Sequence, residues 1–449
     1  MTRTATLEDV LDARRIGGFQ IFVVVLCGLV VLLDGINTQL IGYAAPAISK
    51  SLHLGHGRIA AAFGSGLFGL MIGGLSCSVL ADVLGRKALL VASTLAFGVF
   101  TVASGFSQDL SQLVAWRFLA GLGLGGAMPI AITLTAEVSP RRAEAWMVIA
   151  MFCGFPLGGA LAGVLANAIL PEYGWRAVFY VGGAMALVLT PILALLMPES
   201  IAFLVHRNAP AARISAALRR LAPDAGDVTL VAAIRHAKRS IPVTALFQDG
   251  RALCTLLMWV VYFMSLLDIY FLASWLPTVL NSGGKSLKLA VLGASLLQFG
   301  GVAGTLVIGR VLDRTKPYRM LVGAYVGAAL FIAAIGMASQ GAMLLGVLFG
   351  AGFFLVGGQS GLNYLATSFY PTSARASGIG WGLGIGRIGS IIGPTAGAVL
   401  IATRWPVNAL FLVVAAPCAV AALAVLVMAF AARRQPPQDI PIVAPLLAE

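Results

Sequence analysis

The chain has 449 residues, of which 59% are hydrophobic and only 10% are charged, and its mean hydropathy is +0.95. A soluble domain cannot bury this much apolar surface, so the composition excludes a soluble globular protein and indicates a protein that crosses a membrane many times. The net charge of +13 suggests a nucleic-acid partner, but the positions of the basic residues exclude that class.

Apolar runs along the chain predict twelve transmembrane helices. A helix needs about 20 apolar residues to cross a bilayer. Such runs lie at residues 19–46, 58–81, 87–106, 111–132, 145–170, 175–197, 252–279, 288–311, 319–338, 341–366, 377–401 and 405–432. The runs lack the alternation with a period of two that a transmembrane barrel requires. The sequence therefore predicts an all-α integral membrane protein.

The basic residues define an orientation in the membrane. With the N-terminus inside, 22 of the 30 Lys and Arg residues lie on the inner side, six on the outer side and two within spans. This asymmetry follows the positive-inside rule and predicts that both termini are cytoplasmic. The five cysteines lie singly in apolar spans, so neither disulfides nor a metal site is expected.

The only long polar stretch divides the spans into six and six. We expect an N-terminal bundle at 1–200, a cytoplasmic linker at 201–250 with a short amphipathic helix near 211–221, a C-terminal bundle at 251–432 and a cytoplasmic tail at 433–449. The halves also match at an offset of 231 residues, which carries Pro46 onto Pro277 and Pro140 onto Pro371. Internal repeats of this kind are typical of transporters with two pseudo-symmetric halves.

Few ionisable residues lie within the spans: Asp34, Arg117, Asp268 and Arg387, with Glu137 near the end of a span. A charged side chain within the membrane costs roughly 2.5–3.5 kcal/mol on insertion scales, so such residues usually face a cavity or a partner. Two acids and two arginines in an apolar bundle indicate proton-coupled movement of an anion. The alternative for each residue is an ion pair that only joins helices.

The loop between spans 2 and 3, Leu80–Lys87, and its repeat, Gly309–Arg314, resemble the signature loop of the major facilitator superfamily. Ser78 and Val83 depart from the family pattern, in which Gly and Arg are usual, so the N-terminal copy is expected to be weaker. The resemblance implies a charged latch that breaks when the halves move. Its candidate residues are Asp82, Arg86, Asp313, Arg314, Arg142 and Arg375.

Four further stretches resemble the aromatic acid:H+ symporter family, particularly its 4-hydroxybenzoate and protocatechuate transporters. They are Asp34–Gln39, Met151–Phe155, Tyr270–Pro277 and Gly384–Pro394. The resemblance implies a multi-pass permease of the bacterial inner membrane, with a major facilitator fold of two six-helix bundles, that takes up benzoate-type anions with protons by alternating access. Protons are then the coupling ion, no cofactor is needed, and a single chain suffices.

The chain departs from this family at the proton sites. Asn37 stands where span 1 usually has a second acid, and the 231-residue offset carries Asn37 onto Asp268, where the family usually has Asn. We hypothesise that Asp268 replaces the missing acid and that the two positions face each other across the central cavity. Glu144 replaces a usual Arg, so Glu137 is expected to pair with Arg141 or Arg142, if with any residue.

The site roles follow from charge and polarity. Asp34 is the first candidate for the proton site and Asp268 the second, since burial and a nearby arginine shift a carboxyl pKa in opposite directions. Arg387 and Arg117 compete for the substrate carboxylate, which a guanidinium can bind with two hydrogen bonds. Further candidates for the substrate site are Asn37, Tyr270, Trp275, Gln298, Gln359, Asn363 and Trp381.

Two other functions remain open at this point. A proton-coupled antiporter that exports organic anions or drugs uses the same motifs, because the motifs do not encode direction. The second alternative is a membrane chemoreceptor for aromatic acids that does not transport them. The lack of a signalling domain and the presence of both loop motifs count against it. Neither a phosphate-binding loop nor a catalytic constellation is present, so an enzyme is not expected.

Overall fold

The structure is a computed structural model, and it describes residues 3–5, 11–12, 16–54, 57–207, 209–221, 228–230, 243–248, 250–312, 315, 317–338, 341–370, 375–403 and 405–432. Helices dominate this part of the chain. Its only strands are β1 (Arg3–Ala5) and β2 (Val228–Leu230), which pair in parallel. The predicted all-α fold is therefore confirmed for the membrane region.

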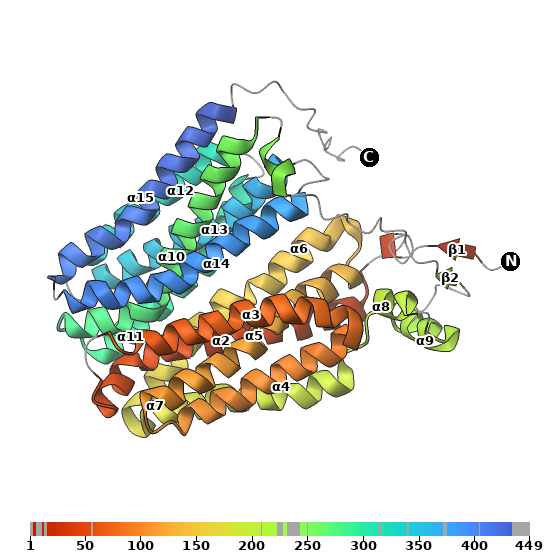
Figure 1. Cartoon of the computed structure of the whole chain (residues 1–449), viewed down its shortest axis with the longest axis horizontal. Helices are drawn as coiled ribbons and strands as arrows, with labels where there is room; N and C mark the ends of the chain where they lie inside the picture. Colours follow the sequence, from red (N-terminus) through yellow and green to blue (C-terminus); the bar gives the residue numbers. More distant parts are fainter. Residues whose placement is uncertain are drawn as a thin grey trace.

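Long apolar helices form an N-terminal bundle (Figure 1). In chain order they are α2 (Gly18–Ser51), α3 (Ala60–Leu84), α4 (Arg86–Gly105), α5 (Leu110–Val138), α6 (Arg141–Phe152) and α7 (Gly154–Leu196). Close pairs within the bundle are α3 with α5 and α2 with α7. Glycines make such approaches possible, since helices without side chains at the contact can pack backbone to backbone.

The helix α7 contains two spans. Its 43 residues are interrupted at Gly174, where φ is +73° and ψ is 179°. A positive φ is strained for residues with a side chain, so glycine at this position lets the chain reverse between spans. By length and composition alone, eleven helices of the described chain can cross a membrane, one of which runs over both α6 and α7. Divided at Gly174, these helices give the twelve predicted spans.

The second half of the chain forms a similar bundle. It follows the linker elements α8 (Ile201–His206), α9 (Ala211–Leu221) and η1 (Val243–Phe247). Its helices are α10 (Ala252–Ser282), α11 (Leu287–Leu312), α12 (Pro317–Ile335), α13 (Ala342–Phe369), α14 (Arg375–Ala402) and α15 (Val407–Ala432). The amphipathic helix predicted in the linker corresponds to α9, which buries Leu218 and Leu221.

The two bundles meet mainly toward one end. Contacts between them join α2 to α10, α3 to α14 and α7 to α11. We call the end at which α2 begins and α15 ends the terminal end, and the opposite end the distal end. Contacts between the halves lie toward the distal end, including an edge-to-face pair of Phe63 and Trp275 with ring centroids 5.2 Å apart. Toward the terminal end the halves diverge (Figure 1).

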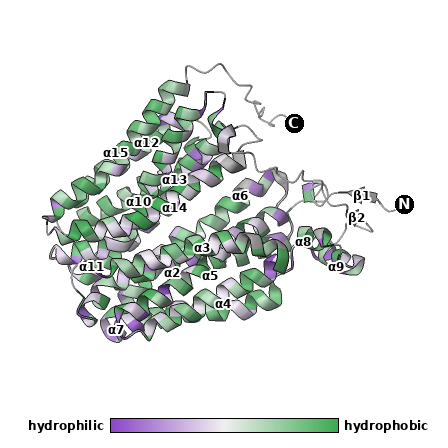
Figure 2. Cartoon of the chain, viewed as in Figure 1, coloured by the Kyte–Doolittle hydropathy of each residue, from purple (hydrophilic) through white to green (hydrophobic). Residues whose placement is uncertain are grey.

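The outer surface of both bundles is apolar. Figure 2 shows hydrophobic residues along the full length of the helices. Large apolar side chains such as Leu195, Met337 and Leu75 are 80%, 76% and 70% exposed. In water such a surface would drive association, so its extent indicates that lipid covers it.

Candidate functional site

Asp34 lies near the middle of α2 and is buried, with 1% exposure. Thr38, one turn further along α2, donates a hydrogen bond of 3.1 Å from Oγ1 to Asp34 Oδ1. The next residue, Gly35, lets α2 approach α7, because a Cβ at this position would overlap the carbonyl group of Phe155. The acid therefore lies beside a close contact between α2 and α7.

Arg387 supplies positive charge from the other half. It lies near the middle of α14, and its Nη1 donates to the hydroxyl oxygen of Tyr270 on α10 at 3.2 Å. Arg387 interacts electrostatically with Asp34 across the interface of the halves. An acid from one bundle thus lies within electrostatic range of a guanidinium from the other, and this guanidinium is hydrogen-bonded to a phenol of its own bundle. The sequence predicted all three residues as candidates for the site.

Arg117 lies elsewhere, inside the N-terminal bundle. It is 3% exposed, its Nη2 donates to the backbone carbonyl oxygen of Asn37 at 3.1 Å, and its guanidinium lies 5.8 Å from the ring centroid of Phe179. Its Nε and Nη1 have no hydrogen-bond partner in the described part of the chain. A buried guanidinium with free donors can accept an anion or water.

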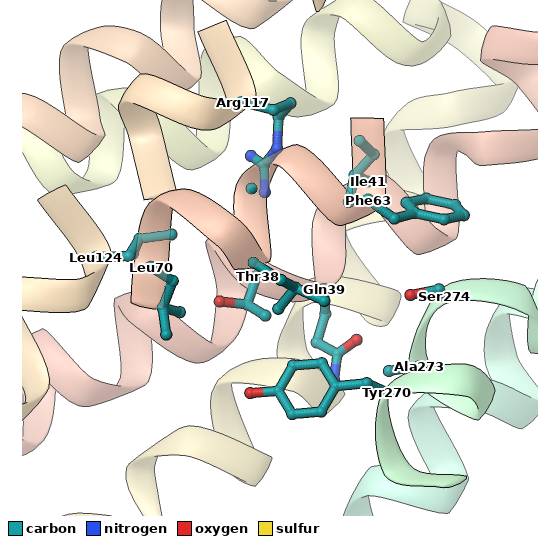
Figure 3. Close-up of a pocket in the computed structure, with 12 residues that line it drawn as sticks. Thr38, Gln39, Ile41, Phe63, Leu70, Arg117, Leu124, Tyr270, Ala273 and Ser274 are labelled. Atoms are coloured by element: carbon teal, nitrogen blue, oxygen red, sulfur yellow. The ribbon is translucent and has the colours of Figure 1, made fainter. Parts of the chain in front are cut away.

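A small cavity between the halves joins these two regions. Arg117 reaches it from the N-terminal bundle, and Tyr270 reaches it from the C-terminal bundle (Figure 3). Figure 3 also shows Thr38 and Gln39 of α2 between the two side chains, with Ser274 of α10 nearby. The cavity is therefore lined by donors and acceptors from both halves.

The hypothesis that Asn37 and Asp268 face each other across the cavity is wrong. Asn37 Nδ2 donates to Leu33 at 2.9 Å and to the carbonyl oxygen of Gly182 at 3.5 Å, both in the N-terminal bundle. Asp268 is fully buried in the C-terminal bundle, where Cys418 Sγ lies 2.9 Å from its Oδ2. The two residues occupy equivalent places, but each side chain points into its own bundle because both lie on the inner faces of α2 and α10.

Trp275 contributes to the closed distal end. Its indole Nε1 donates to the carbonyl oxygen of Pro394 at 2.8 Å, and its ring is 1% exposed against Phe63 of the other half. In this conformation the side chain joins α10, α14 and α3. The structure therefore does not place the Trp275 side chain beside Arg387 as a surface that a substrate could contact.

The other predicted substrate residues are spread over the C-terminal bundle. Gln298 of α11 lies beside Gly159 of α7 at the interface of the halves, and a Cβ at Gly159 would lie 2.5 Å from its Nε2. Asn363 accepts a hydrogen bond of 2.9 Å from Tyr262. Gln359 is buried, and its Oε1 has no partner among described residues.

Trp381 lies closer to the terminal end of α14. It is 44% exposed and stacks on Trp259 of α10 with ring centroids 5.9 Å apart. Phe247 of η1 forms an edge-to-face pair with Trp259, with ring centroids 5.5 Å apart. These rings form an aromatic cluster away from the Asp34 and Arg387 pair, so the structure does not place Trp381 in the central site.

Glu137 has a partner that the sequence did not predict, and its expected pairing with Arg141, whose side chain is outside the described residues, or with Arg142 stays a prediction. Glu137 forms an ion pair with Arg86 of the signature loop, and Ser200 donates a hydrogen bond to the same carboxylate. The pair joins the start of α4 to the end of α5 at the terminal end of the molecule, whereas Asp34 lies near the middle of α2. Arg142, one of the two expected partners, donates to the backbone carbonyl oxygen of Asp12 at 3.0 Å.

Part of the predicted latch cannot be placed. Asp313 and Arg314 lie outside the described residues, and the side chains of Asp82 in α3 and Arg375 in α14 are outside the description as well. For these four residues the latch role stays a prediction.

The sequence reasoning missed Glu199, which organises the signature loop. Its Oε1 accepts hydrogen bonds from the backbone N–H groups of Arg86 at 3.1 Å and Lys87 at 3.0 Å. These are the first residues of α4, where a carboxylate stabilises free N–H groups and the helix dipole. Gly85, with φ of +98°, makes the turn into that helix. The signal in the sequence was the acid directly after a span, in Pro198-Glu199-Ser200.

Comparison with known proteins agrees with this architecture. The family model of the Major Facilitator Superfamily matches residues 27–386 and 258–447. Among solved structures, the inward open conformation of the xylose transporter XylE from E. coli has a TM-score of 0.74 at 16% sequence identity, with 93% of this chain and 96% of that chain covered. At that identity the likeness shows the fold alone.

Closer relatives share more of the sequence. The chain is 36% identical over 430 residues to the 4-hydroxybenzoate transporter PcaK of Pseudomonas putida, covering 95% of this chain and 96% of the relative. It is 37% identical over 433 residues to the gallate transporter of Pseudomonas putida, covering 96% of each. These relatives confirm the resemblance drawn from the motifs. The chain therefore belongs to the major facilitator superfamily, and it is a membrane transporter rather than an enzyme.

Proposed function

We propose that the protein imports a small aromatic carboxylate of the hydroxybenzoate type together with protons, by alternating access. The observation that carries the proposal is the electrostatic interaction between Asp34 of one half and Arg387 of the other, near the middle of their helices, with Tyr270 hydrogen-bonded to Arg387. The names of the relatives, which include 4-hydroxybenzoate and gallate transporters, support the substrate class.

The proposed orientation follows from the positive-inside distribution. The terminal end is then cytoplasmic, and the distal end, where Phe63 packs on Trp275, faces the periplasm. The structure corresponds to a conformation closed to the periplasm, from which substrate leaves toward the cytoplasm. A single chain forms the whole interface between the halves, so the protein can work as a monomer.

Arg387 is the proposed ligand of the substrate carboxylate. It is only partly buried and uses one Nη1 donor on Tyr270, so its remaining N–H groups are available for a carboxylate. Arg117 is less suited in this conformation, because it is 3% exposed and its Nη2 is held by the backbone of Asn37. The hydroxyl of Tyr270, beside the guanidinium, is a further hydrogen-bonding group for the substrate.

Asp34 is the proposed carrier of the coupling proton. An ionised Asp34 attracts Arg387 and so competes with the substrate carboxylate for the same cation. A neutral Asp34 removes this competition. Proton and anion then bind together more favourably than either alone, which is the thermodynamic requirement for symport.

The test uses the protein reconstituted in liposomes with labelled 4-hydroxybenzoate under an inward proton gradient. Uncoupler-sensitive accumulation supports the proposal. Gradient-driven loss of substrate from the vesicles would instead indicate an antiporter, and binding without transport would indicate a receptor. The matched variant Asp34→Asn should keep exchange of internal for external substrate while losing the accumulation that the Asp34 proton drives, because exchange requires no net proton movement.

A further inference from the structure

Four polar side chains in the core of the C-terminal bundle lie outside the central site. Asp268 and Ser265 are three residues apart on α10 and therefore share a face of that helix. Tyr325 of α12 interacts electrostatically with Asp268 and Cys418, and Ser265 lies beside its hydroxyl. Cys418 of α15 contacts Asp268 Oδ2 at 2.9 Å. Three helices thus converge on one carboxyl group.

The hydrogen bonding of this cluster is incomplete. Asp268, Ser265, Tyr325 and Cys418 are each 0% exposed. Asp268 Oδ1, Ser265 Oγ and Tyr325 Oη have no hydrogen-bond partner among described residues. The Ser265 and Tyr325 hydroxyls lie beside each other and can pair by a small rotation, which leaves Asp268 Oδ1 as the unpaired atom. Buried polar atoms are nearly always paired, so an unpaired carboxyl oxygen indicates a site that takes up a ligand or changes its protonation.

The ligand that fits is a proton. No Lys or Arg forms an ion pair with Asp268 in the described chain; the titratable groups that face it or its neighbour Tyr325 are Cys418, Tyr325 itself and Tyr262. An unpaired carboxylate in a dry interior is strongly disfavoured, so the carboxyl group is neutral in this conformation. A metal cation is a poorer fit, because one ligand is a sulfur and few oxygens are at hand.

The same cluster can also accommodate the ionised form. The thiol of Cys418 and the hydroxyls of Ser265 and Tyr325 are rotatable donors, and hydrogen bonds to a carboxylate favour its charged form. The helix α10 carries both Asp268 and Tyr270, which bonds to Arg387 in the central site. It also contacts the other half, since a Cβ at Gly42 would overlap the backbone of Ala273. Movement of the halves therefore acts on the helix that holds Asp268.

We propose that Asp268, with Ser265, Tyr325 and Cys418, forms a second proton site inside the C-terminal bundle, separate from the site between the halves. The carboxyl group holds one proton in the present conformation and releases it to water once per transport cycle. The inference rests on the proposed function, since it assigns a second coupled proton to the same symporter. It also replaces the hypothesis that Asp268 faces Asn37 across the central cavity.

Transport measurements test the coupling. In liposomes with the membrane potential clamped at zero, each coupled proton supports about a tenfold accumulation of substrate per pH unit. Asp268→Asn should retain exchange of 4-hydroxybenzoate, take up one proton fewer per substrate, and accumulate about tenfold less per pH unit. Wild-type stoichiometry in a variant that still exchanges substrate would overturn the inference. Absence of accumulation by the unmodified protein would refute the proposed symport instead.

Infrared spectra of the purified protein test the site without transport. The band of a neutral carboxyl group at neutral pH should be lost in Asp268→Asn. Tyr325→Phe, which removes a donor to the ionised form, should move the titration of that band to higher pH by about one unit. Tyr180→Phe is the matched control, since its hydroxyl donates to Gly105 in the other bundle. An ionised Asp268, or equal titration in both tyrosine variants, would overturn the inference.

Discussion

A single methyl group at Gly42 should open the closed end of the transporter. Gly42 of α2 packs against α10 of the other half, and an added Cβ would overlap the carbonyl oxygen of Ala273 and lie 3.2 Å from the Cα of Ser274. Both neighbours are backbone atoms, which cannot rotate away. The helices must separate by about 1 Å to reach ordinary van der Waals distances. Overpacking of this kind costs about 1–3 kcal/mol.

This free-energy cost applies only to the conformation in which the distal ends of the two halves are in contact. Gly42→Ala should therefore shift the equilibrium toward the conformation open at the distal end by about 5–150-fold. Spin labels at Lys50 and Thr403, both exposed near the distal end, would report the change as a larger population of long distances. Gly28→Ala on the same helix is the control, since its Cβ would meet no atom within 4 Å. Equal distance distributions in both variants would refute the reasoning.

Other predictions concern the charged residues. Arg387→Lys should raise the KM for 4-hydroxybenzoate by about 10–100-fold through loss of the two-bond contact, whereas Arg117→Lys should change it less; equal effects in an uptake assay would contradict the assignment of the carboxylate to Arg387. Asp34→Asn should lower uncoupler-sensitive accumulation by about tenfold per pH unit and keep exchange, and loss of both would argue against a coupling role. Glu137→Gln should lower stability by about 1–3 kcal/mol because it removes the negative charge of the largely buried ion pair with Arg86. Thermal unfolding measures this loss. The double variant Glu137→Gln with Arg86→Gln should be little less stable than either single variant, because both changes remove the same interaction.

Much of the architecture could be predicted because it depends on the composition of single segments. Each span is recognisable from about 20 apolar residues, since lipid cannot satisfy backbone hydrogen bonds and forces helices on the chain. The choice of Asp34 and Arg387 as candidates for the site followed from the same physics, because ionisable residues are rare within spans. Even the division of α7 into two spans at Gly174 could be read from the apolar runs.

The directions in which side chains point could not be predicted in the same way. The repeat offset carries Asn37 onto Asp268, and the hypothesis took both positions to face the cavity. Both face the interior of their own bundle, against Gly182 and Cys418. A helix of a transporter has one face toward lipid or its own bundle and another toward the opposite half, and apolar composition is similar on both.

Sequence alone thus determined the number of spans, the repeated halves, the family and the small set of charged residues in the membrane, because each depends on local composition or on motifs. Tertiary structure decided which of those charges meet. It places Asp34 within electrostatic range of Arg387, pairs Glu137 with Arg86 and buries Asp268 in the core of a bundle. These partners are distant along the chain, and only the packing of the helices sets the rotation of each around its axis.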